Sequence, residues 1–248
     1  MQLLAIDQGN TRTKFGLFAE GSLLRSWTCA TRKDSTAAEL ASAAFSAPDI
    51  PPGIPLGLST VTPELRERWR AMAREAGSPL TIFTGQSPTP LAMAYATPET
   101  LGADRWLAAV AAARLVGTPV LPISLGTATV VDAVSADGVY LGGMIAPGIG
   151  LAAQALSDAA SALWAVEWRV PEDAGIGHSS ETALAAGWFY HSVGGVRAMV
   201  RAIRDALGAD APIALTGGWA TRLAPHLDGV ALCDEYLVLR GIDILMEK

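Results

Sequence analysis

Apolar residues form short runs near the start of the chain and recur at helical spacing further along it, a combination typical of an α/β protein. Leu3 to Ile6 form a continuous apolar run that ends at Asp7. Such a run predicts a buried strand stopped by a turn. Apolar pairs on either side of Glu20-Gly21 predict two further strands joined by a tight hairpin. The chain is therefore expected to open with three antiparallel strands.

Several later stretches carry apolar residues at helical spacing. One follows Thr62-Pro63-Glu64, where a hydroxyl N-cap, a proline and an acid predict a helix start, and Gly77 predicts its end. Another spans Ala103 to Val116. The stretch from Ser179 to about Leu207 contains three glycines, which predict a kinked or divided helix. We further expect a helix at Ala37–Phe45 and strands at Pro55–Val61, Thr81–Phe83 and Ile213–Leu215.

The plan of the opening strands is repeated in the second half of the chain. The apolar run Val120–Ile123 leads into the small polar turn Ser124–Thr129, and a hairpin is predicted around Asp137-Gly138. This echo of residues 7–28 at residues 124–145 predicts two similar halves, each a mixed sheet with flanking helices, and a cleft between them. The predicted halves are residues 1–116 and 117–248.

Composition and charge exclude several classes of protein. The 248 residues include 18 Lys and Arg against 24 Asp and Glu, which gives a net charge of −6. The chain therefore lacks the excess of basic residues that is typical of proteins that bind nucleic acids or anionic membranes. Cys29 and Cys233 lack metal-ligand spacing and favour a reducing compartment. The sequence shows no signal peptide, and Arg and Pro interrupt its most apolar stretch, Trp106–Leu125. We therefore expect a cytoplasmic protein that does not enter a membrane.

Residues 7–14 combine an acid, a glycine, hydrogen-bonding side chains and two cations. Phosphate chemistry suits this mixture, because a glycine turn frees main-chain N–H groups, cations bind phosphate oxygens and a carboxylate holds hydrated Mg²⁺. A strand-ending turn in a hairpin is the alternative that the segment alone leaves open. The glycine spacing is that of neither a Walker loop nor a dinucleotide fingerprint. The echo at Ser124–Thr129 favours a function, since two such turns can hold a polyphosphate.

Motifs along almost the whole chain resemble those of the type III pantothenate kinases, members of the acetate and sugar kinase, Hsp70 and actin superfamily. Their order and spacing carry the resemblance. The motifs are Asp7-Gln8-Gly9-Asn10-Thr11 with Lys14; Ser59-Thr60-Val61-Thr62-Pro63; Tyr95 before Gly102-Ala103-Asp104-Arg105; Gly126-Thr127-Ala128-Thr129 with Asp132; Gly142-Gly143-Met144-Ile145-Ala146-Pro147-Gly148; Thr216-Gly217-Gly218; and Leu237-Val238-Leu239-Arg240-Gly241.

The resemblance implies an actin-like, ribonuclease H-like fold and transfer of the γ-phosphate of ATP to the primary hydroxyl of pantothenate. The product would be 4′-phosphopantothenate, in the first step of coenzyme A biosynthesis. Asp7 would hold Mg²⁺, directly or through water. The residues implied to bind ATP are Asp7, Gln8, Gly9, Asn10, Thr11, Arg12, Thr13, Lys14, Thr127, Gly217 and Gly218.

The resemblance also assigns the acceptor site to Gly102-Ala103-Asp104-Arg105. Asp104 matches the family's catalytic base, and Arg105 can pair with the pantothenate carboxylate. Tyr95 matches a residue that contacts the substrate, and so does Ser180, which stands where the family has threonine. Judged without the resemblance, Asp104 is an ordinary first-turn charge and Arg105 a solvated surface residue.

Ser124 departs from the family pattern, which has an aspartate there associated with a bound monovalent cation, K⁺ or NH₄⁺. A neutral hydroxyl is a poorer ligand for such a cation, so the dependence on K⁺ is in question. The family further implies a homodimer in which the second subunit helps to bind pantothenate. A non-catalytic nucleotide-binding paralogue with a regulatory role and a kinase of another small alcohol are the alternatives.

Overall fold

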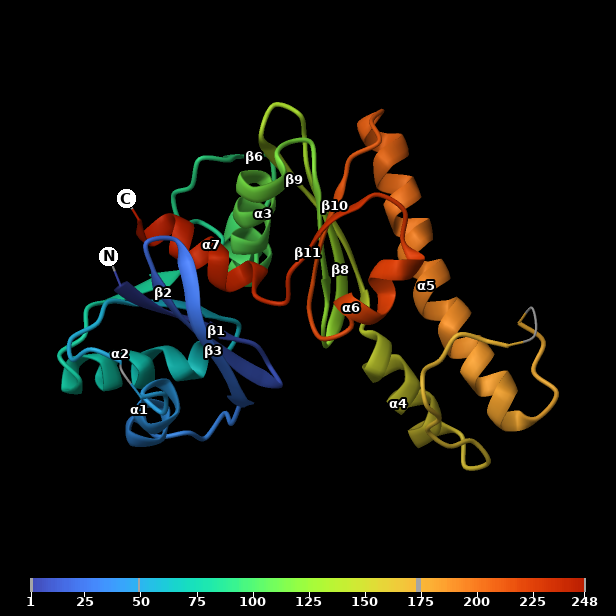
Figure 1. Ribbon diagram of the computed structural model, residues 1–248, viewed down its shortest axis with the longest axis horizontal. Helices are drawn as coiled ribbons and strands as arrows, with labels where there is room; N and C mark the ends of the chain where they lie inside the picture. The colour runs from blue at the N-terminus through green and yellow to red at the C-terminus, as the bar shows by residue number, and fades with distance from the viewer. Residues whose placement is uncertain (1, 49, 173–174, 248) are drawn as a thin grey trace. The chain divides into compact units, whose positions relative to one another are not determined.

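The computed structural model describes residues 2–48, 50–172 and 175–247. The chain forms two compact units, one of residues 1–115 with 236–248 and one of residues 116–235 (Figure 1). The predicted division differs from these units at the C-terminus. Residues from Tyr236 onward pack with the first unit, because the last helix lies against its sheet.

The first unit is built on a sheet with the strand order β3-β2-β1-β4-β5. The three N-terminal strands are antiparallel, as predicted, whereas β4 and β5 run parallel to β1. The predicted strands at 55–61 and 81–83 are also confirmed. The bounds are β1 Gln2–Gln8, β2 Arg12–Ala19, β3 Ser22–Ala30, β4 Leu56–Thr60 and β5 Leu80–Phe83. The short strand β6, Ala92–Met93, is not part of this sheet.

Helices cover both faces of this sheet. Helices α1 and α2 pack on the face that carries Phe15 and Trp27, and α7 lies against β1, β4 and β2. Figure 1 shows α1 and α2 next to the N-terminal strands. The bounds are α1 Ala37–Ala44, α2 Arg66–Glu75, α3 Ala103–Val116 and α7 Leu237–Met246, with 3₁₀ turns at Pro63–Leu65 and Pro98–Thr100.

The helical segment starts at Pro63 and ends before Gly77, as predicted, but its first turn is a 3₁₀ turn and the predicted cap by the Thr62 hydroxyl is wrong. Thr62 makes no capping hydrogen bond, and its buried hydroxyl has no partner within residues 2–48, 50–172 and 175–247. The N–H of Thr62 instead donates to Thr60 Oγ1 at 3.1 Å. A 3₁₀ turn at Pro63–Leu65 then precedes the α-helix. Gly77 has φ of +64°, which ends the helix in the left-handed conformation that glycine allows.

The second unit repeats the plan of the first. Strands β7, β8 and β9 are antiparallel, and β10 and β11 lie parallel to β7 on its other side, in the order β11-β10-β7-β8-β9. This order matches that of β5-β4-β1-β2-β3 and confirms the predicted internal repeat. The bounds are β7 Leu121–Leu125, β8 Ala128–Val134, β9 Val139–Pro147, β10 Ile213–Thr216, β11 Val230–Cys233, α4 Ile149–Ala159, α5 Ser180–Leu207, α6 Ala220–Leu223 and a 3₁₀ turn at Ala224–His226.

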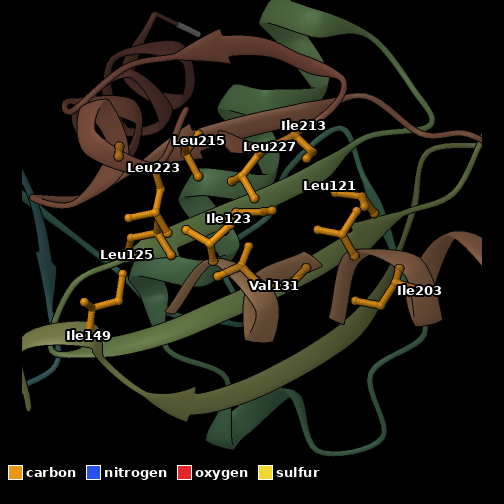
Figure 2. Packing of buried hydrophobic residues seen from close by; sticks show 14 of the residues in the cluster. Leu121, Ile123, Leu125, Val131, Ile149, Ile203, Ile213, Leu215, Leu223 and Leu227 are labelled. Atoms are coloured by element: carbon orange, nitrogen blue, oxygen red, sulfur yellow. The ribbon is translucent and has the colours of Figure 1, made fainter. Parts of the chain in front are cut away.

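Helix α5 is one continuous helix, so the prediction of a divided helix is wrong. Its three glycines lie on exposed positions, where a Cβ would meet no atom within 4 Å. Its opposite side carries apolar residues that pack onto β7, β8 and β10 and hold the helix together (Figure 2). These residues are Phe189, Val193, Val196, Val200 and Ile203. Among the described helices, none is long and apolar enough to cross a membrane.

Candidate active site

Three polar side chains meet on one face of the first sheet. Asp7, near the end of β1, lies opposite Lys14 in the antiparallel register with β2 and opposite Ser59 in the parallel register with β4. Directly paired residues project to the same side of a sheet. The buried strand therefore delivers a carboxylate, flanked by an ammonium and a hydroxyl, to the edge where β1 ends.

Burial and a second carboxylate set the electrostatics of this face. Burial, together with the negative charge of Asp104, raises the pKa of Asp7 from 3.8 to about 7, while Lys14 and the Ser59 hydroxyl act in the opposite direction. Two carboxylates that approach each other favour a cation between them. Asp104 stands in the first turn of α3, so the side chains come from two elements of one unit.

Gly102 leaves room for the carboxylate of Asp104. A Cβ at Gly102 would collide with Asp104 Oδ1, so the carboxylate folds back over this glycine. The next residue, Arg105, holds its guanidinium 5.6 Å from the centre of the Tyr95 ring, in cation–π geometry. The predicted acceptor residues of the first unit are thus brought together at the start of α3.

Gln8 and Thr13 face away from Asp7, because neighbouring residues of a strand point to opposite sides. Gln8 Oε1 accepts hydrogen bonds from Thr60 Oγ1 at 2.9 Å and from Trp69 Nε1 at 3.0 Å, inside the core. Thr13 Oγ1 lies 2.9 Å from Thr31 Oγ1. The side chains of these two residues therefore do not lie on the face that carries Asp7, and only their main-chain groups are near it.

The turn between β1 and β2 is closed by the N–H of Gly9, which donates to the Arg12 carbonyl at 3.0 Å. Asn10, Thr11 and Arg12 are exposed around it. Their main-chain and side-chain donors therefore stay accessible at the end of the strand that carries Asp7.

In the second unit, three turns converge beside the end of β7. The Thr127 carbonyl accepts the Gly148 N–H at 3.0 Å, and Thr127 itself is exposed. Gly217 has φ of +98°, and a Cβ there would collide with the main chain of Leu125. The N–H of Trp219 donates to the Leu125 carbonyl at 3.3 Å. The second predicted phosphate segment and the predicted adenosine segment are therefore neighbours within this unit.

The remaining predicted residues of the second unit lie on other elements. Ser124 is half-buried in β7, paired with Val130 and with Thr216. Gly218 is exposed beside Gly217. Ser180 begins α5, is exposed, and lines an apolar cavity of about 600 Å³ formed with α4 and residues 163–166.

The site includes residues that sequence reasoning did not assign. Ser59 occurs in a recognised motif but was given no role, and only the parallel register of β1 with β4 places it beside Asp7. The ring of Tyr236 lies 5.8 Å from Lys14 Nζ. This residue was given no role, because the helix that it precedes was not predicted.

The donor set of the first unit fits Mg²⁺. Within the part of the chain that the structure describes, no group of three or more His, Cys, Asp and Glu residues could hold a metal ion by itself. Mg²⁺ bound with a nucleotide commonly uses one or two carboxylates together with waters and phosphate oxygens. Asp7 supplies such a carboxylate, and a cation would offset the repulsion from Asp104 that raises its pKa.

Comparisons with known proteins point to one family. A family model described as type III pantothenate kinase matches residues 3–202. The type III pantothenate kinase of Thermomicrobium roseum is 34% identical over 256 aligned residues, which cover 99% of this chain and 97% of the relative.

Two solved structures share the fold. One, described as a conserved Baf family transcriptional activator from Campylobacter jejuni, has a TM-score of 0.65 and 20% identity and covers 99% of this chain and 98% of its own. A ROK family glucokinase from Streptomyces griseus, in complex with glucose and AMPPNP, has a TM-score of 0.56 and 13% identity over 99% of both chains. The predicted actin-like α/β fold class is thereby confirmed.

Proposed function

The chain belongs to the type III pantothenate kinase family, and from this premise we propose that it transfers the γ-phosphate of ATP to the primary hydroxyl of pantothenate. The observation that carries the proposal is the meeting of Asp7, Lys14 and Asp104 on one face of the first unit, next to Arg105. This arrangement combines a metal-binding acid, a phosphate-binding cation, a base and a group that can bind a carboxylate.

Asp104 acts as the base. Its carboxylate accepts the proton of the attacking hydroxyl as the new bond to phosphorus forms, and Gly102 keeps the space into which it folds. Arg105 binds the pantothenate carboxylate in a bidentate way, and Tyr95 limits the positions open to the guanidinium. These residues fix the acceptor in line with the phosphate, which is the main requirement of phosphoryl transfer.

Each unit carries residues that the resemblance assigns to the nucleotide. Lys14 and the exposed donors at Asn10, Thr11 and Arg12 contact phosphate oxygens, and Asp7 holds Mg²⁺ directly or through water. Bound Mg²⁺ neutralises charge that develops on the phosphates. In the second unit Thr127, Gly217 and Gly218 offer main-chain and hydroxyl groups to the rest of the nucleotide.

A neutral residue at position 124 weakens any site for a monovalent cation. Ser124 contributes a hydroxyl where the resemblance expects an aspartate, so K⁺ loses its charged ligand. We expect phosphoryl transfer by this chain to respond weakly to K⁺ and NH₄⁺.

A homodimer would cover apolar surface of the second unit. Leu156 and Trp164 are 49% and 52% exposed and line the cavity at whose rim Ser180 lies. A second copy seated there would bury these side chains and explain how Ser180, at the start of α5, takes part in substrate binding. Light scattering that gives the mass of two chains supports this assembly, and the mass of one chain excludes it.

We place the protein in the cytoplasm, where coenzyme A precursors are made.

ADP production by the purified protein tests the proposed reaction. The assay holds ATP and Mg²⁺, adds pantothenate or other small alcohols one at a time, and includes a reaction without acceptor. We expect ADP to form only when pantothenate is the acceptor, both in the presence and in the absence of K⁺. ADP formation with a different alcohol would identify a kinase of another substrate. Folded protein that binds ATP without turnover would identify a non-catalytic paralogue.

A further inference from the structure

Helix α7 is oriented so that its first turn lies over Lys14. A Cβ at Gly16 would lie 3.1 Å from Leu239 Cδ1, so this part of α7 packs directly on β2. Gly16 and Lys14 share a face of β2, because residues two apart in a strand point to the same side. Tyr236 precedes Leu239 by three residues, which is about one helical turn. The fold therefore places Tyr236 and Lys14 at matching positions on the helix and the strand.

The two side chains are in contact. Lys14 Nζ lies 5.8 Å from the centre of the Tyr236 ring, within the range of a cation–π interaction. Tyr236 occupies the N-cap position of α7, yet within the residues described its side chain makes no capping hydrogen bond. Capping thus does not account for a tyrosine at this position, and the ring places its face toward the Lys14 ammonium.

Lys14 is a demanding residue to hold in place. Its ammonium sits on a flexible stem, and fixing such a side chain costs conformational entropy. It also lies opposite Asp7, whose carboxylate it influences. A ring that holds the ammonium on this face before ATP arrives reduces the ordering required on binding.

We propose that Tyr236 is a positioning residue for ATP, which acts by holding Lys14 against the face that carries Asp7. The inference rests on the proposed function only for the identity of the nucleotide. Tyr236 lies in the first unit, and no motif of the resemblance includes it.

Substitutions at Tyr236 separate the ring from the rest of the residue. We expect Tyr236→Leu to raise the KM for ATP about three- to fivefold, while kcat and the KM for pantothenate change by less than about twofold. Tyr236→Phe keeps the ring and should retain the KM of the unmodified chain. Tyr236→Met, which is flexible and lacks a ring, takes the place of the leucine variant if the latter loses the folded state in thermal unfolding. Equal changes in all three kinetic constants would overturn the proposal.

A double-mutant cycle with Lys14→Met provides the decisive readout. If Tyr236 acts through Lys14, then Tyr236→Leu should have less than half of its effect when Lys14 is already replaced. Fully additive effects would show that Tyr236 acts only through helix α7 and would reject the inference. The same cycle measured by calorimetric titration of ATP with Mg²⁺ keeps the test separate from catalysis. A chain that binds ATP without turnover refutes the proposed function alone, and a chain that binds no ATP refutes both.

Discussion

The two repeated hairpins differ in charge although they share a strand order. In the first unit the acid Asp7 pairs with Lys14 across a turn of residues 9–11. In the second unit Ser124 pairs with Val130 across a shorter turn of residues 126–127. The repeat has therefore preserved the strand plan while the charged pair is found in the first hairpin alone.

This difference assigns distinct chemical roles to the two units. The first provides the carboxylates and the ammonium, and burial together with the charge of Asp104 raises the pKa of Asp7 there. The second provides close main-chain approaches around Leu125, where Gly217 adopts a positive φ. Changes of charge should therefore affect the reaction most in the first unit, and an added charge should produce a new property in the second.

The largest effect is expected from Asp104→Asn. The amide cannot accept the hydroxyl proton, so kcat should fall about 10²-fold or more. ATP affinity should be unchanged or slightly higher, because a negative charge near the phosphates is removed. Steady-state kinetics and calorimetry measure the two effects. Asp137→Asn, at the exposed turn between β8 and β9, is the matched control and should keep full activity. A nearly normal kcat for Asp104→Asn would remove the base assignment.

Gly102→Ala tests how closely the base must be placed. The new methyl group collides with Asp104 Oδ1 and forces the carboxylate out of its position. We expect a fall in kcat of about tenfold with little change in the KM for ATP, because misplacement of a reacting group is costly. Gly187→Ala, on the exposed side of α5 with no atom within 4 Å, controls for the substitution itself. It should raise helix stability slightly. Unaltered turnover in Gly102→Ala would mean that the carboxylate acts from elsewhere.

Asp7→Asn should change the pH dependence of stability. Because the pKa of Asp7 in the folded chain is about 7, above its ordinary 3.8, the folded state binds more protons than the unfolded state between these values. The free energy of unfolding of the parent chain should therefore fall as pH rises from about 4 to 7 and then level off.

The asparagine variant has no carboxyl group to titrate at this position. It should match the parent chain near pH 4 and exceed it in free energy of unfolding by about 1–2 kcal/mol at pH 8, a figure reduced from the full shift because Asp7 is partly accessible to solvent. Denaturant unfolding in buffer with a chelator, which removes Mg²⁺, measures the difference. A gap between the two chains that stays constant with pH would contradict a raised pKa for Asp7.

Local sequence patterns predicted much of the fold and part of the site. The N-terminal strands and the bounds of α3 follow from apolar runs and helical spacing, and both are confirmed. The helix start at Pro63 was also predicted, but the cap by Thr62 was not found, because the Thr62 N–H donates to Thr60 Oγ1 and the Thr62 hydroxyl accepts no helical N–H. Helix α7 was not predicted, although its amphipathic sequence carries a helical signal that could have revealed it.

The site was predicted only as far as neighbours in sequence could reveal it. Asp7 and Lys14 were grouped because they share a short segment. The side chain of Gln8 points into the core because β1 extends to that residue and neighbouring strand residues face opposite sides, and the end of the strand was predicted one residue too early to show this. The approach of Asp104 to Asp7 depends on tertiary packing across nearly one hundred residues, and the position of Ser59 beside Asp7 depends on strand pairing across about fifty. Local patterns carry no information about such contacts.

The smallest expected effect, and the one that would sharpen the contrast between the hairpins, comes from Ser124→Asp. The substitution gives the second hairpin an acid at the position that echoes Asp7, and a carboxylate is a far better ligand for K⁺ than a hydroxyl. Turnover of this variant should rise severalfold when Na⁺ is replaced by K⁺ at constant ionic strength, whereas the parent chain responds weakly. Ala198→Asp adds the same charge to an exposed position of α5 and should show no such response. If both aspartate variants behave alike, position 124 is not a cation site, and the neutrality of the second hairpin has no bearing on the use of K⁺.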